Sequence, residues 1–300
     1  GKILWQREVL ALELGGMPHE QAKRIHEAME VARMTHVLRG GHGPGSIVDE
    51  GDKARQLRQK LPQLMEKLWR PVIEAADPSL LPAFDQDLAW ARNAASATDE
   101  QAGELERKKF DALQRAMERK YGVPIHRAWI GYLGYAITTP VSDGQHVWVQ
   151  FYSGALACYD LEGNRVWGKR IAGGGDKYSC FEPLSLHGNI LVARVPHDYA
   201  VVGLDKLTGQ EQWRLDFPKS DSGGASASSQ YCHDLSVDLP LPDGKTMRAL
   251  IMQSTRRIIR PSDGKVLGTF TYEVEGKAGR TGYDGRGHVP ARWDCPSTDR

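Results

Sequence analysis

The sequence predicts a mostly β protein with an α-helical region. Residues 18–121 show helical periodicity and almost no strand signal, whereas residues from about 136 onward form short β-rich runs bounded by Asp-Gly and Gly-Asn turns. The β-rich runs also repeat along the chain. We therefore expect residues 1–15 to hold one strand of a repeated β unit, residues 16–130 to form a helical insertion, and residues 131–300 to hold the repeats.

The helical region is predicted from apolar residues that recur at three- and four-residue steps. These residues are Ile25, Met29 and Ala32, then Leu57, Leu61, Leu64 and Leu68, then Phe110, Leu113 and Met117. Thr98 and Gln101 have the spacing of a capping box, and Pro62, Pro71, Pro78 and Pro82 are expected to divide the middle into shorter helices. We expect the faces that carry Ile25, Leu61, Leu64 or Phe110 to contact the β unit.

The β-rich part contains two full copies and one weaker copy of a unit of short runs. The copies span Pro140–Trp167, Pro183–Trp213 and Pro242–Leu267. The turn glycines Gly163 and Gly209 lie 46 residues apart, and Gly209 and Gly264 lie 55 apart. Four short strands in about 40 to 50 residues is the length of a propeller blade, so we predict a partial β-propeller of about three four-stranded blades.

Each copy has residues whose physical role in a turn can be stated. An Asp before a tight turn accepts backbone N–H groups, a Gly supplies positive φ, and a Trp four residues later offers a large surface to the neighbouring blade. We expect both tryptophans to be largely buried between blades, with their indole N–H groups bonded to carbonyl oxygens. The structural repeat positions are Asp160, Gly163, Trp167, Asp205, Gly209, Trp213, Asp263 and Gly264.

The segments Cys158-Tyr159-Asp160-Leu161-Glu162-Gly163-x3-Trp167 and Gly203-Leu204-Asp205-Lys206-Leu207-Thr208-Gly209-x3-Trp213 resemble the tryptophan-docking repeat of the PQQ-like propellers. That superfamily includes quinoprotein alcohol dehydrogenases and many non-enzymatic scaffold proteins. The resemblance covers residues 136–270, and Gly1–Trp5 looks like the last strand of a preceding or closing blade. The family usually has Ala where Cys158 and Gly203 stand, and the third copy has Gly268 where the docking Trp would fall.

The resemblance also defines what a quinoprotein dehydrogenase would require. Such an enzyme needs an Asp base, a calcium site, an Arg near the quinone and, in many members, adjacent cysteines beneath the cofactor. The turn acids already have a structural role in the repeat, and the four cysteines are far apart. Disulfides and buried thiols both remain open for Cys158, Cys180, Cys232 and Cys295.

Other chemical motifs give no catalytic or metal assignment. None of the ten histidines forms H-x-x-x-H or H-E-x-x-H, although His187, His197 and His233 belong to strand ends or loops. The run Gly173–Gly175 follows a strand and opens no helix, so it does not predict a phosphate cradle. There is no G-x-S-x-G motif. We therefore assign no catalytic residue, no metal ligand and no cofactor.

Charge and hydropathy restrict the partners. The 39 basic and 38 acidic residues nearly cancel, which disfavours nucleic acid and acidic membranes, and no apolar run is long enough to cross a bilayer. The resemblance implies a periplasmic or secreted protein. Our favoured interpretation is a non-catalytic binding or scaffold propeller that engages a protein or glycan. The alternative is a PQQ-dependent oxidoreductase that uses calcium and acts on alcohols or sugars.

Overall fold

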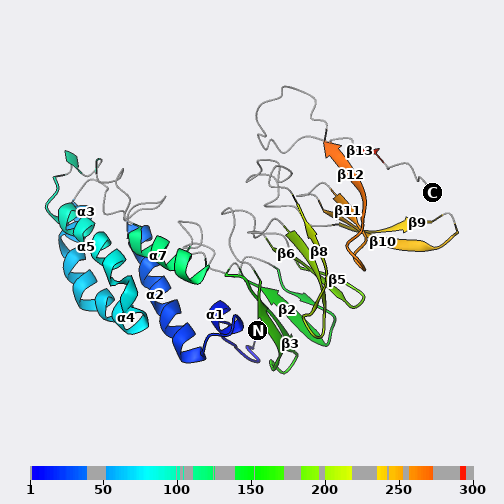
Figure 1. Cartoon of the computed structure of the whole chain (residues 1–300), viewed down its shortest axis with the longest axis horizontal. Coiled ribbons are helices and arrows are strands. Elements are labelled where there is room, and N and C mark those ends of the chain that lie inside the picture. Colours follow the sequence, from blue (N-terminus) through cyan, green and yellow to red (C-terminus); the bar gives the residue numbers. More distant parts are fainter. Residues whose placement is uncertain are drawn as a thin grey trace. The chain divides into compact units, whose positions relative to one another are not determined.

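The structure is a computed structural model of the 300-residue chain. It describes residues 2–38, 52–98, 100–101, 104, 111–123, 125, 139–151, 153–171, 184–195, 200–217, 235–241, 243–252, 257–272 and 291–294. The chain divides into two compact units, which Figure 1 displays in the colours of the sequence. The β unit comprises Gly1–Arg7 and Ala136–Arg300, and the helical unit comprises Glu8–Tyr135.

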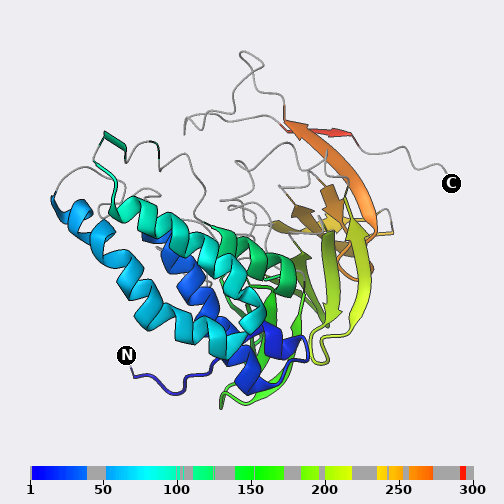
Figure 2. The same ribbon diagram turned by 60° about the vertical axis from the view of Figure 1, so that its left-hand side comes forward.

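The helical unit is built from short and medium helices. Helix α2 packs against α4 and α7, and α5 packs against α3 and α7 (Figures 1 and 2). The elements are α1 (Ala11–Leu14), α2 (His19–Leu38), α3 (Asp52–Leu64), the π-helix η1 (Met65–Trp69), α4 (Arg70–Ala76), the 3-10 helix η2 (Pro78–Leu80), α5 (Leu81–Ala95) and α7 (Ala112–Tyr121).

Prolines mark the helix starts in the middle of this unit. Pro78 occupies the first position of η2, where a missing N–H costs no intrahelical hydrogen bond, whereas Pro71 and Pro82 lie at the second positions of α4 and α5, directly after η1 and η2. Pro62 instead lies inside α3, which continues into the π-helix η1. The helical run is continuous over residues 52–76 and again over 78–95, so the expected division is confirmed only at Asp77, which is extended and precedes Pro78.

The capping box of Thr98 and Gln101 is also confirmed. The backbone N–H of Thr98 donates to Gln101 Oε1 at 3.0 Å, and the backbone N–H of Gln101 donates to Thr98 Oγ1 at 3.4 Å. Ile25 and Leu61 are fully buried, whereas Leu64 is 38% exposed. Phe110 lies outside the described residues, and the contact of these faces with the β unit stays a prediction.

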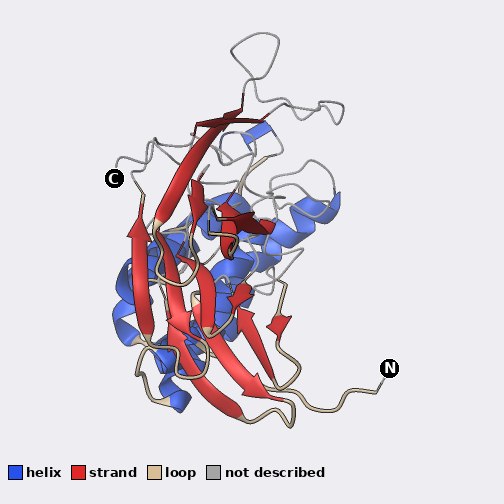
Figure 3. Ribbon diagram, turned by 90° about the vertical axis from the view of Figure 1, so that its right-hand side faces the viewer, coloured by secondary structure: helices blue, strands red, loops and turns tan. Residues whose placement is uncertain are grey.

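The described residues of the β unit form three antiparallel sheets, whose strands are the red arrows of Figure 3. The first sheet is β1 (Val141–Ser142), β2 (His146–Gln150), β3 (Ala155–Asp160) and β4 (Arg165–Arg170). The second is β5 (Ser185–His187), β6 (Ile190–Val195), β7 (Ala200–Asp205) and β8 (Glu211–Asp216). The third is β9 (Leu235–Pro240), β10 (Thr246–Met252), β11 (Arg257–Ile259) and β12 (Val266–Tyr272), with β13 (Ala291–Asp294) paired to β12.

Each of the three sheets is an up-and-down meander in which consecutive strands pair, as in a propeller blade. The predicted fold class, a partial propeller-like β fold with a helical region, is confirmed. The third sheet differs from the expected four strands because β13 adds a fifth strand at its outer edge.

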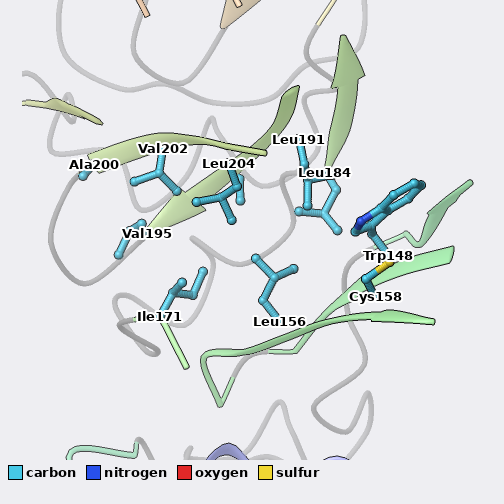
Figure 4. Close-up of a cluster of buried hydrophobic side chains, with 11 residues drawn as sticks. Trp148, Leu156, Cys158, Ile171, Leu184, Leu191, Val195, Ala200, Val202 and Leu204 are labelled. Atoms are coloured by element: carbon cyan, nitrogen blue, oxygen red, sulfur yellow. The ribbon is translucent and has the colours of Figure 1, made fainter. Parts of the chain in front are cut away.

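The sheets pack face to face through alternating apolar side chains. The first and second sheets share a core that Figure 4 shows in close-up: Trp148, Leu156, Cys158, Ile171, Leu184, Leu191, Ala193, Val195, Ala200, Val202 and Leu204. The second and third sheets share another core, formed by Val192, Val201, Phe217, Leu250, Met252 and Ile259. Each side of the second sheet is therefore buried against one neighbour.

The start of the chain corrects one expectation. Residues 2–10 form neither strand nor helix, and residues 11–14 form α1, so the strand expected within residues 1–15 is not present. A strand needs a neighbour whose backbone completes the ladder of hydrogen bonds, and no described strand pairs with this segment. Side chains hold the segment on the β unit instead.

Candidate functional site

The turns between the third and fourth strands place the predicted aspartates and glycines. Gly163 and Gly209 have φ of 82° and 69°, the left-handed region in which glycine is unstrained. The Asp160 carboxylate accepts the backbone N–H of Asn164 at 2.7 Å, and the Asp205 carboxylate accepts that of Thr208 at 2.8 Å. Hydrogen bonds from the Asn164 and Thr208 side chains are the main cause that lowers the pKa of Asp160 and Asp205 respectively.

Each tryptophan of the repeat lies on the turn glycine of the following sheet. A Cβ added at Gly209 would fall 2.7 Å from Trp167 Cε3, and one added at Gly264 would fall 2.5 Å from Trp213 Cε3. The indole N–H of Trp167 donates to the carbonyl of Lys206 at 2.8 Å. These glycines therefore provide the space into which the rings fit.

The expected carbonyl partners of both indoles are confirmed, because Trp213 donates to the carbonyl of Pro261 at 2.8 Å. The side chains of Trp167 and Trp213 are half-buried, which is less than we expected. The reason is that each ring covers a turn at the end of the sheets, whereas fully buried Trp148 lies inside the core.

Trp5 occupies the equivalent place on the first sheet. A Cβ added at Gly163 would fall 2.6 Å from its ring, and its indole N–H donates to the carbonyl of Leu161 at 2.9 Å. Two residues later, Arg7 donates to the carbonyl of Gly163 at 2.8 Å, as Lys169 of β4 does to the glycine carbonyl of the next turn. The segment thus docks by its side chains like the outer strand of a sheet.

The third turn is arranged differently. The N–H of Gly264 donates to the carbonyl of Arg260, so Arg260 takes the backbone place that Asp160 and Asp205 hold in the first two turns. Asp263 accepts a hydrogen bond from Arg260 Nε at 2.8 Å and another from the backbone of Lys265 at 3.2 Å. The side-chain hydrogen bond from Arg260 is the main cause that lowers the pKa of Asp263.

A further turn acid links the first two sheets. Asp143 accepts the Lys206 ammonium at 2.8 Å and the backbone N–H of His146 at 2.8 Å. The bond from Lys206 is the main cause that holds the pKa of Asp143 far below its usual value. Sequence reasoning did not select Asp143 or Lys206, although the Asp143-Gly144 turn was visible as a turn signal.

Burial shifts the pKa of two described groups of the β unit, Cys158 and His187. Cys158 is a free, fully buried thiol, and burial raises its pKa to about 12. Burial, with a smaller effect from Arg248, lowers the pKa of His187 to about 4. The remaining predicted candidates, Cys180, Cys232, Cys295, His197, His233 and Gly173–Gly175, lie outside the described residues.

Two acids of the helical unit were also missed by sequence reasoning. Buried Asp87 of α5 accepts the backbone N–H groups of Ala112 and Leu113, at 2.9 and 3.0 Å, and so caps the start of α7. Burial is the main cause that raises the pKa of Asp87 to about 6. At the end of α7, Asp77 accepts the Tyr121 hydroxyl at 2.5 Å. Both ends of α7 are thereby tied to the rest of the unit.

The opposite end of the sheets, away from these turns, carries arginines. Arg194 is near the end of β6, and its backbone carbonyl accepts Gln150 Nε2 of the first sheet at 2.9 Å. Arg257 begins β11, and its guanidinium lies 4.6 Å from the centre of the Phe217 ring, which follows β8. These two contacts join the three sheets at this end.

The strand register shows that both arginines face the interface between the second and third sheets, which we call the seam. Arg194 pairs with Val201, and Arg257 pairs with Met252. Val201 and Met252 both belong to the core between the second and third sheets, and paired residues lie on the same face of a sheet. Arg194 and Arg257, which we call the seam arginines, therefore lie on the two facing sides of this seam and are half-buried there.

No group of three or more His, Cys, Asp or Glu residues that could hold a metal was found among the described residues. Likewise, no helix in the described ranges is long and apolar enough to span a membrane.

The three sheets, together with the tryptophan rings that pack on the turn glycines, define a propeller-like repeat protein. No protein-family model matches the chain, and no curated protein matches it. Solved structures that resemble it include BamB from Moraxella catarrhalis (TM-score 0.31, 15% identity, 42% of this chain and 34% of that one).

Two other solved structures resemble the chain at a similar level. The quinohemoprotein alcohol dehydrogenase ADHIIG from Pseudomonas putida HK5 has a TM-score of 0.23 and 12% identity, over 43% of this chain and 33% of that one. The computationally designed Ika8 protein has a TM-score of 0.26 and 16% identity, over 47% and 40%. The chain matches about two fifths or less of the length of each of these structures.

Proposed function

We propose that this chain is a binding or scaffold propeller that engages a protein or glycan partner and performs no catalysis. The observation that carries the proposal is that four turn acids of the β unit are engaged in hydrogen bonds. Asp143, Asp160, Asp205 and Asp263 all accept hydrogen bonds within or between turns, and each has a lowered pKa. A general base must be free to take a proton near neutral pH, which these carboxylates are poorly suited to do.

The other reactive groups of the β unit support the same proposal. A thiol whose pKa is about 12 holds almost no thiolate at neutral pH, so Cys158 is a poor nucleophile. His187 has a pKa of about 4 and is neutral at pH 7, with its Nε2 3.1 Å from the Ser185 hydroxyl. Cys158 belongs to the core between the first two sheets, and His187 pairs with Ile190 in the second sheet.

We further infer that the repeats belong to the PQQ-like, tryptophan-docking class. The support is the recurrence of one arrangement at three successive turns, where Trp5, Trp167 and Trp213 each cover a glycine and bond to a carbonyl of the same turn. The resemblance to that class implies a periplasmic or secreted protein, and we propose this localisation for the chain.

A dye-linked dehydrogenase assay tests the proposal directly. The chain is incubated with PQQ and Ca²⁺, and dye reduction is followed over a panel of alcohols and sugars. We expect no turnover above the rate with boiled protein. Turnover that disappears when PQQ or Ca²⁺ is omitted would contradict the proposal and establish the oxidoreductase alternative.

A further inference from the structure

The segment of residues 2–7, which we call the N-terminal segment, lies on the first sheet as β4 lies on the second. The Trp5 ring covers Gly163, and its indole N–H donates to a carbonyl of the same turn at 2.9 Å. Arg7 donates to the Gly163 carbonyl at 2.8 Å. The tryptophan of β4 and the lysine two residues after it make the same contacts with the turn of the second sheet. Side chains two residues apart point to one side of an extended chain, so the segment has the alternation of an outer strand.

The backbone of the N-terminal segment lacks the strand partner that β4 has. β4 pairs with β3, whereas within the described part of the chain no backbone N–H of residues 2–7 donates to a backbone carbonyl. The side chains of Ile3 and Leu4 are also 79% and 81% exposed. An extended segment with free N–H and C=O groups can accept a strand of another polypeptide through main-chain hydrogen bonds.

The face of the first sheet on which Trp5 lies is less covered than the same face of the second sheet. Val147 pairs with Tyr159, whose ring centre lies 5.8 Å from that of Trp5, so all three are on one face, which we call the Trp5 face. Val147 and Val149 of this face are half-buried. Leu191, at the place of Val147 in the second sheet, is fully buried because the first sheet covers it. The Trp5 face therefore still has apolar surface that an added strand can cover.

The strand pairs within the chain show what a strand beside Trp5 requires. Trp167 is paired with Cys158, and Trp213 is paired with Gly203. A Cβ added at Gly203 would fall 2.1 Å from the Trp213 ring, so a larger residue does not fit there. Apart from their final aspartates, β3 and β7 are otherwise apolar. A strand that pairs with the N-terminal segment should therefore be apolar and have a glycine or another small residue opposite Trp5.

We propose that a β-strand of a partner polypeptide pairs with residues 3–7 and lies along the Trp5 face, with a glycine opposite Trp5. The proposal rests on the binding function proposed above and identifies the partner as a protein that presents an apolar strand. Binding converts the N-terminal segment into the outer strand of a sheet shared by two chains.

The ladder between β3 and β4 predicts which backbone groups form the new bonds. The N–H of Ile171, directly after β4, donates to the carbonyl of Gly154, directly before β3. Alternate residues of a strand face the same neighbour, so the N–H groups of Trp167 and Lys169 also face β3. By the equivalence of the two tryptophans, the amides of Trp5 and of the residue two positions later face the partner strand.

Fluorescence anisotropy with two matched peptides tests this binding. The first peptide has the sequence Ala200–Asp205 of β7, followed by two lysines for solubility and labelled with fluorescein. The second peptide has valine in place of the glycine. Valine favours strand structure more than glycine does, so adhesion of an apolar strand to any exposed surface would favour the valine peptide. A fit beside the Trp5 ring would favour the glycine peptide.

We expect the full chain to bind the glycine peptide, and the valine peptide at least about tenfold more weakly, because the added side chain overlaps the Trp5 ring. Trp5→Ala should weaken binding of the glycine peptide by about tenfold or more, because the ring no longer holds the segment on the sheet. The control is Leu207→Ser, which removes a leucine that is 48% exposed and should change binding by less than about twofold. Near-UV circular dichroism checks that both variants are folded.

Amide hydrogen exchange of the unsubstituted chain gives a second readout, which decides if Trp5→Ala does not fold. With saturating glycine peptide, the amides of Trp5 and Arg7 should exchange at least about tenfold more slowly. The amides of Leu4 and Gln6 should slow less, because alternate residues face away from the partner strand.

Three results would overturn the proposal. The first is no binding of the glycine peptide, or binding that leaves the Trp5 and Arg7 amides unprotected. The second is a valine peptide that binds as tightly as the glycine peptide. The third is slower exchange of these amides in the chain alone as its concentration rises, which would assign the strand to a second copy. None of them affects the proposed lack of catalysis, since turnover is measured separately, and quinone-dependent turnover would refute that function whether or not the peptide binds.

Discussion

Replacing Gly209 with Ala should destabilise the β unit well beyond the cost of its backbone conformation. The new Cβ would lie 2.7, 2.8 and 3.1 Å from three ring atoms of Trp167, whereas carbon atoms in favourable contact are about 3.5–4.0 Å apart. The ring must therefore shift by about 1 Å, which strains its bond to the Lys206 carbonyl. Overpacking of this kind costs about 1–3 kcal/mol, and a left-handed φ adds about 1–2 kcal/mol.

Gly144→Ala is the matched control. Gly144 has φ of +85°, similar to the +69° of Gly209, and an added Cβ would meet nothing within 4 Å. It should therefore cost only the backbone term of about 1–2 kcal/mol. The difference of about 1–3 kcal/mol between the two variants corresponds to about 2–12 °C in melting temperature for a unit of this size.

Urea denaturation followed by tryptophan fluorescence, with calorimetry for the melting temperature, measures both variants. In a Trp167→Leu background the cost of Gly209→Ala should fall to that of Gly144→Ala, because the ring that opposes the Cβ is gone. Equal losses for the two alanine variants, within about 0.5 kcal/mol, would refute the steric account of the turn.

Three other predictions concern single side chains. Trp213→Ala should lower the free energy of unfolding, measured by urea denaturation, by about 3 kcal/mol, because it removes a large packed ring and leaves the Pro261 carbonyl without its donor. A decrease of less than about 1 kcal/mol would contradict the packing role of this ring. In the folded protein Cys158 should resist iodoacetamide at pH 8, because its pKa is about 12; rapid modification, mapped by mass spectrometry, would argue against its burial. The pKa of Asp77 is lowered to about 2, against the effect of burial, by hydrogen bonds of which the one from Lys120 is the largest, so its stabilising contribution is present above about pH 4 and is lost as the pH falls through about 2. Asp77→Asn should therefore reduce the loss of helical circular dichroism between about pH 4 and about pH 2. A loss of signal equal to that of the unchanged protein would show that Asp77 does not cause the acid unfolding.

Several features were predictable because they depend on residues close together in the chain. The capping box of Thr98 and Gln101 is formed by residues three positions apart, and the glycine turns follow from local backbone conformation. The repeat length likewise showed how many sheets to expect. Trp5 was recognised by its Gly-x3-Trp spacing, but that spacing could not show that the segment would lack a strand partner.

The facing positions of two arginines were decided only by the tertiary structure. Arg194 and Arg257 belong to different repeats, and neither lies at a position that the repeat pattern marks as special. Only the packing of the second sheet on the third, together with the strand register, places their side chains on facing sides of one seam. Amino-acid sequence by itself determined the turns, the caps and the repeat, since local interactions specify them. Long-range packing determined which charges face one another, because that depends on how separate repeats stack.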